Sequence, residues 1–128
     1  MIKLIKHGIN LIKHQLKDVG ISKKRSSHWP KLEKEFLEQH PTCEICGSKT
    51  RLNVHHIKPF HLFPELELDP TNLITLCMSR KECHFKIAHG SNFSSYCPNI
   101  NLYIKQFHNK EKTFEELCLI AKSEKLFR

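Results

Sequence analysis

The chain has 128 residues, a formal net charge of +8 and a sequence pI of about 9.3. This length fits one domain with a core of ordinary size, and the charge favours a polyanionic partner, first of all nucleic acid, because cationic side chains release counterions from phosphates. The longest apolar runs, such as LITLC, are far shorter than the roughly 20 residues of a membrane-spanning helix, so we expect no membrane span.

Residues 1–24 are expected to form a basic amphipathic helix and a linker. The apolar residues recur in steps of three and four, which is typical of one helical face, and Gly20 can end the helix. We favour packing of this helix on the body of the protein over an arm that dimerises or lies on DNA or anionic lipid. In the following SKKRSS stretch, the candidate phosphate contacts are Lys23, Lys24 and Arg25, although a solvated charge run is the commoner explanation.

A second helix precedes the first cysteine. Its expected apolar face consists of Trp29, Leu32, Phe36 and Leu37, and Pro41 ends it. Alternation from Leu52 to Ile57 then predicts a short strand, followed by a loop over residues 60–72. Ser79 and Glu82 fit a capping box for a helix from about Arg80 to Ala88, with Gly90 at its end. Strand, loop and helix form the expected central unit.

The C-terminal part is expected to brace this unit. Asn92 to Asn101 is typical of a loop, with Pro98 as a breaker. Thr113 and Glu116 form a second capping-box match at the start of a C-terminal helix. The apolar face of that helix consists of Phe114, Leu117, Ile120 and Ala121.

Four of the six cysteines are candidate ligands of a structural Zn²⁺ ion. No small-residue cleavage site follows the polar-interrupted N-terminal segment, so we expect an intracellular protein, in which cysteines are more often metal ligands than disulfides. Cys43 and Cys46 form C-x-x-C, whereas Cys77 and Cys83 are separated by five residues instead of the common two. The alternative is four unrelated buried thiols. Cys97 and Cys118 are expected to pack as small hydrophobic residues.

The stretches HPTCEIC, LNVHHIKP, PELELDPTNLITLC and CH together resemble the HNH endonuclease family, in the zinc-containing form of phages and mobile elements. The resemblance covers residues 25–98, which would be the nuclease core between the N-terminal segment 1–24 and a helical extension 99–128. It implies an α+β fold with a small ββα-metal core, in which a hairpin and a helix hold one divalent ion. We expect one compact domain.

The resemblance also implies a role for each site residue. His56 resembles the general base and Asn72 the residue that pins the loop and orients this base. His55 and His84 resemble ligands of a catalytic Mg²⁺ or Mn²⁺ ion. His89 is a further candidate ligand, but a step of five residues swings a side chain by about 140° around an α-helix, so a surface or phosphate-contacting histidine stays an alternative. Lys58 is a candidate DNA contact beside this motif.

The resemblance implies an endonuclease that nicks or cuts double-stranded DNA and leaves 5′-phosphate and 3′-hydroxyl ends. The alternative is a zinc-stabilised module that binds DNA or an assembly partner without catalysis. The amphipathic N-terminus is a candidate surface for homodimerisation or for docking on phage machinery. The order of His56, Asn72 and His84 favours the enzyme, because a binding module has no reason to keep it.

Overall fold

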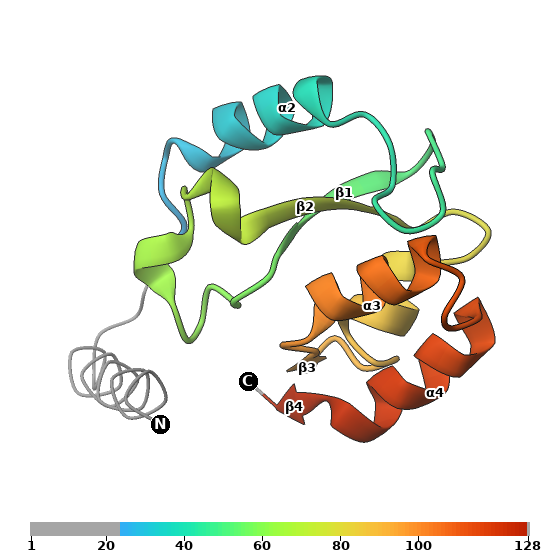
Figure 1. Cartoon of the computed structure of the whole chain (residues 1–128). Helices are drawn as coiled ribbons and strands as arrows, with labels where there is room; N and C mark the ends of the chain where they lie inside the picture. Colours follow the sequence, from blue (N-terminus) through green and yellow to red (C-terminus); the bar gives the residue numbers. More distant parts are fainter. Residues whose placement is uncertain (1–23, 128) are drawn as a thin grey trace.

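The computed structural model describes residues 24–127 and has the α+β architecture expected from the sequence (Figure 1). The expected N-terminal helix and Lys23 lie outside the described residues. Helix α2 (Trp29–Gln39) lies on one side of a two-stranded sheet, and helices α3 (Ile100–His108) and α4 (Phe114–Glu124) lie on the other. Within residues 24–127, no helix is both long and apolar enough to span a bilayer.

The sheet consists of strands β1 (Leu52–His56) and β2 (Leu73–Cys77), which pair antiparallel with Leu52 opposite Cys77 and His56 opposite Leu73. Phe36 of α2 packs against Val54 and Leu73 in a small core, as expected from the apolar face of this helix. A larger core on the other side of the sheet is built from buried residues that include Leu76, Ile87, Ile100 and Leu117. Neighbouring residues of β1 therefore face two different environments.

Two short 3₁₀ turns, η1 (Pro64–Leu66) and η2 (Pro70–Asn72), interrupt the loop between the strands. Asp69 caps the second turn, since its carboxylate accepts a hydrogen bond of 2.9 Å from the backbone N–H of Thr71. The loop is thus folded into a defined shape before it enters β2.

The helix predicted from Arg80 to Ala88 is wrong in its start and its type. The helical segment, η3 (His84–Ala88), is a π-helix with Cys83 at its N-cap. Glu82 has a left-handed φ of 49°, which interrupts any helix that begins at Arg80. The predicted capping box is also wrong: no side chain caps η3, and the Ser79 hydroxyl lies 2.8 Å from the Ser48 hydroxyl.

The C-terminal helix α4 begins as predicted. Thr113 and Glu116 form a capping box with hydrogen bonds of 3.0 and 3.1 Å, and Leu117 and Ala121 are fully buried. Helix α3 and a second small sheet of β3 (Ser95–Tyr96) and β4 (Leu126–Phe127) were not predicted as separate elements. Helix α4 packs against η3, so the tail braces the central unit as expected.

Gly90 is the tightest point of this packing. It has a φ of 56°, and a Cβ atom added there would lie 2.8 Å from the carbonyl oxygen of Ala121. Gly90→Ala should lower the free energy of unfolding by about 1–3 kcal/mol, because strain and a backbone clash add. Urea unfolding of the zinc-loaded protein measures this.

Gly47→Ala is the matched control, since Gly47 also has a positive φ, of 77°, but nothing lies within 4 Å of its added Cβ. The two substitutions share the cost of the left-handed backbone and differ in the clash. An equal or larger loss for Gly47→Ala would contradict the close approach at Gly90.

Candidate active site and metal centres

The four predicted zinc ligands gather at one point. Cys43 and Cys46 lie in the turn after α2, which closes with a 2.9 Å hydrogen bond from the N–H of Gly47 to the carbonyl of Cys43. Cys77 ends β2, and Cys83 begins η3. The four sulfur atoms lie within 4.8 Å of one another, and those of Cys46 and Cys77 are 3.5 Å apart. Tetrahedral Zn–S bonds of about 2.3 Å would place sulfurs about 3.8 Å apart, so the set fits Zn²⁺.

The long spacing between Cys77 and Cys83 is accommodated by a loop. The N–H of Met78 donates to the carbonyl of Arg51 over 2.7 Å, and the N–H of Glu82 donates to the carbonyl of Ser79 over 2.9 Å. These bonds turn the intervening residues outward, and Cys83 returns to the cluster. The ligand spacing therefore does not count against the site.

The chemistry of the thiols also fits a cation. A hydrogen bond from Cys83 lowers the pKa of the Cys43 thiol to about 4, whereas the same contact and burial raise the pKa of Cys83. Sulfurs this close cannot all be thiolates unless a positive charge balances them. A Zn²⁺ ion supplies that charge and holds coordinating thiols deprotonated.

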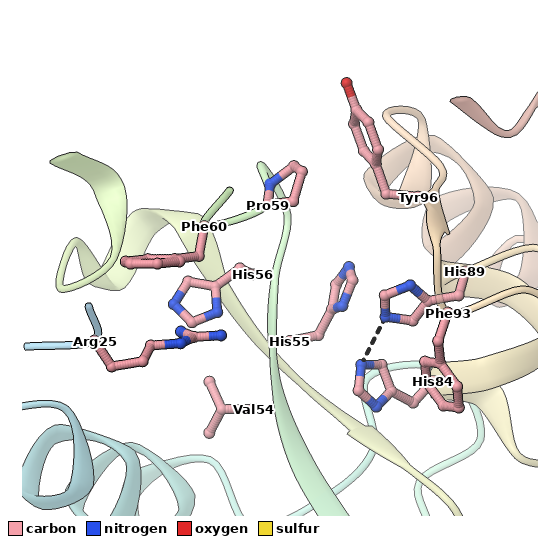
Figure 2. Close-up of a pocket in the computed structure, with 10 residues that line it drawn as sticks. All are labelled: Arg25, Val54, His55, His56, Pro59, Phe60, His84, His89, Phe93 and Tyr96. Atoms are coloured by element: carbon pink, nitrogen blue, oxygen red, sulfur yellow. Dashed lines mark hydrogen bonds between the residues drawn. The ribbon is translucent and has the colours of Figure 1, made fainter. Parts of the chain in front are cut away.

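A second cluster consists of His55 from β1, His84 from η3 and His89 at the end of η3 (Figure 2). One ring nitrogen of each lies within 4.8 Å of the others. The predicted obstacle for His89, a step of five residues, is removed by the π-helix, whose i to i+5 hydrogen bonding brings His84 and His89 to the same side. The structure thus brings together all three predicted ligands of the catalytic ion.

Hydrogen bonds orient two of these rings. The Nδ1–H of His84 donates to the side-chain oxygen of Asn53 over 3.1 Å, and the Nδ1–H of His89 donates to the carbonyl of Ser95 over 2.7 Å. Their Nε2 atoms are in hydrogen-bond contact at 3.1 Å, and both can offer a lone pair to a cation when each ring carries its proton on Nδ1. Two imidazoles on one ion, each at about 2.1 Å, lie roughly 3.0–3.4 Å apart, so the donor set fits a divalent ion.

His56 points away from this cluster, toward Arg25 and Phe60 (Figure 2). Its Nε2–H donates to the carbonyl of Glu67 over 3.0 Å, and its ring lies 4.5 Å from that of Trp29. Burial lowers the pKa of His56, and the positive charge of Arg25 lowers it further. The ring is therefore neutral near pH 7, with Nδ1 as the acceptor.

Asn72 ties the loop to the end of β1. Its side-chain oxygen accepts from the N–H of Lys58 over 2.8 Å, and its amide donates to the carbonyls of Lys58 and Leu66 over 3.1 and 3.4 Å. Its own carbonyl accepts from Ile57 over 2.8 Å. These bonds fix the loop immediately before Glu67, whose carbonyl holds the ring of His56.

Of the predicted phosphate contacts within residues 24–127, Arg25 is the one that enters the site. Its guanidinium lies 3.7 Å from the buried carboxylate of Glu67 and 4.6 Å above the ring of Phe60. Lys24 and Lys58 are exposed, and Lys58 lies over Phe63.

A cavity of about 200 Å³ joins Arg25 and His56 to the histidine cluster. Its lining residues are Arg25, Val54, His55, His56, Pro59, Phe60, His84, His89, Phe93 and Tyr96.

Comparison with known families identifies this region. The family model described as HNH endonuclease matches residues 43–89. This stretch is therefore similar to HNH endonuclease domains. It begins at the first clustered cysteine and ends at the last clustered histidine, so the HNH domain contains both candidate metal centres. No curated protein and no solved structure matches the chain.

Several residues around the HNH site were not predicted. Asn53 stands two residues before His55 in β1, and this alternation alone indicates that both side chains share a face. Glu67, Phe93, Ser95 and Tyr96 carry no comparable signal. Their positions follow from the folded loops rather than from any spacing.

Cys43→Ser should remove zinc and destabilise the protein, because a structural zinc site contributes folding free energy directly. We expect the midpoint of thermal unfolding to fall by roughly 10 °C or more. Zinc analysis and circular dichroism measure the two effects. Cys118→Ser is the control, because Cys118 is half-buried in α4 and lies outside the cluster; a zinc-loaded Cys43 variant of normal stability would contradict the site.

Proposed function

We propose that the protein is an endonuclease that hydrolyses phosphodiester bonds in DNA, with His56 as the general base and His55, His84 and His89 as ligands of one divalent ion. The observation that carries this proposal is the cavity in which the ring of His56 and the three-histidine cluster meet. The family of the HNH domain supports nuclease chemistry in general.

His56 has the geometry of a base. The bond from its Nε2–H to Glu67 selects the tautomer whose Nδ1 accepts a proton, and the lowered pKa keeps the ring neutral. Nδ1 can therefore take the proton from a water molecule that attacks phosphorus. Asn72 holds the loop that orients this ring, which lowers the reorganisation needed during the reaction.

Arg25 supports the binding of a phosphate group beside His56. Contacts with Glu67, Phe60 and Trp29 hold the guanidinium, which can donate to two phosphate oxygens at once. When bound to the three histidines, a divalent ion would supply Lewis acidity to the phosphoryl group and stabilise the departing 3′ oxygen. The products expected from the family resemblance are 5′-phosphate and 3′-hydroxyl ends.

DNA as the substrate is supported by the charge of the chain. A net charge of +8 favours association with a phosphate backbone, and Lys23, Lys24 and Lys58 are further candidate contacts. The alternative of a zinc-stabilised module without catalysis predicts the same affinity for DNA. Only a test of cleavage separates the two.

His56→Ala should reduce nicking of supercoiled plasmid by about 10²–10⁴-fold, because it removes the proton acceptor. DNA affinity and thermal stability should stay near those of the wild type. The control is His108→Ala at the exposed end of α3. Equal nicking by purified His56→Ala and wild-type protein would reject the assignment of the base, and no nicking by the wild type in any divalent ion would favour the binding module.

The three nitrogen donors also predict a metal preference. Imidazole suits transition metals, whereas Mg²⁺ prefers oxygen ligands and keeps its waters. Of the two ions expected from the sequence, Mn²⁺ should therefore reach half-maximal nicking at a lower concentration than Mg²⁺, and Co²⁺ or Ni²⁺ at a lower one still. Metal titrations of the nicking rate measure this order, and a preference for Mg²⁺ would count against an all-nitrogen site.

A further inference from the structure

His89 depends on parts of the chain beyond the HNH domain for its position. It is the C-cap of η3, with φ of −108° and ψ of 1°, so the helix does not continue through it. Its Nδ1–H donates to the carbonyl of Ser95 over 2.7 Å, and the Ser95 hydroxyl in turn shares its one proton between the carbonyls of His89 and Asn92, at 2.6 and 2.7 Å. Ser95 is fully buried. One residue thus fixes both the ring and the backbone of His89.

Ser95 is in turn held by the C-terminal strand. It lies in β3, opposite Phe127 of β4 in the antiparallel pair. Just before β4, the ammonium group of Lys125 donates to the carbonyl of Gly90 over 3.2 Å. Strand β4 and Lys125 therefore contact both ends of the segment from Gly90 to Ser95, which carries the partner of His89.

The side chains of β4 contribute little to the core. Leu126 is 50% exposed and Phe127 is 70% exposed. A segment that stabilised the fold through burial would hide such apolar groups. What β4 supplies is its backbone pairing with the strand that carries Ser95.

We propose that Ser95 and β4 form a clamp that positions the His89 ring for the catalytic ion, which makes Ser95 a positioning residue and the C-terminal strand a part of the metal site. The proposal rests on the proposed function in one respect, namely that the three histidines bind a divalent ion. Residues that orient a metal-binding histidine typically change metal affinity by 10–100-fold when they are lost.

The main test breaks β4 in the full-length, zinc-loaded protein. Leu126→Pro combined with Phe127→Pro removes both backbone donors of the strand, whereas Leu126→Ala combined with Phe127→Ala keeps them and removes the same exposed side chains. Mn²⁺ is the probe, because it does not compete for thiolates, and the electron paramagnetic resonance signal of free Mn²⁺ reports its binding. His84→Ala defines the signal that belongs to the histidine cluster.

We expect the proline pair to bind Mn²⁺ about 10–100-fold more weakly than the wild type, and the alanine pair to bind it normally. Zinc content and the thermal midpoint should stay close to wild type in both. Unchanged Mn²⁺ affinity in the proline pair would overturn the clamp. A second outcome would also overturn it: if the proline pair lost zinc and stability as well as Mn²⁺ binding, β4 would be needed for folding rather than for positioning His89.

Ser95→Ala tests the clamp independently, with Ser94→Ala as control, since Ser94 is its exposed neighbour. We expect weaker Mn²⁺ binding with retained zinc for Ser95→Ala only, and normal binding would count against the clamp. The outcomes are separable from those of the nuclease proposal. A wild-type protein that binds Mn²⁺ at the histidines but nicks no DNA rejects the nuclease, while the affinities of the variants still decide on the clamp.

Discussion

The convergence of four sulfurs is the constraint on which the rest of the structure depends. The thiols belong to the turn after α2, the end of β2 and the start of η3, so a cation bound there ties three elements together. His84 directly follows Cys83, and His55 lies in β1, which pairs with β2. The cysteine cluster therefore also sets the distance between His55 and His84, two candidate ligands of the catalytic ion.

The sequence predicted the residues whose side chains can bind a metal ion by their own chemistry. The C-x-x-C pair indicated a thiolate site whatever the backbone does between the ligands, which is why Cys83 was found despite its long separation from Cys77. The histidine ligands came from the resemblance to the HNH endonuclease family. The capping box at Thr113 was also predictable, because a helix N-terminus is satisfied by residues three apart. The α+β class was implied by the resemblance to the HNH endonuclease family, and the described elements confirm it.

The remaining features depend on contacts between distant segments. A helical period of 3.6 residues placed His89 away from His84, but η3 is a π-helix, and its end is held by a hydrogen bond of 2.9 Å from the N–H of Cys97 to the carbonyl of Ala88. The buried carboxylate of Glu67 is stabilised by the N–H of Ser26, 41 residues earlier. Strands of two residues, such as β3 and β4, are too short to show any alternation. No local pattern could have revealed these features.

Because side chains alternate along β1, the candidate metal ligand and the candidate general base lie on opposite faces of the strand. His55 faces the histidine cluster, while His56 faces the α2 side and lies against Trp29. A base near a cation remains useful only if it stays neutral, and burial together with Arg25 favours the neutral form of His56. The carboxylate of Glu67 balances the guanidinium of Arg25, which limits the energetic cost of placing a positive group beside the candidate metal site. An incoming phosphate would then meet a partly neutralised Arg25 and an uncharged imidazole, so the site can attract an anion without protonating its own base.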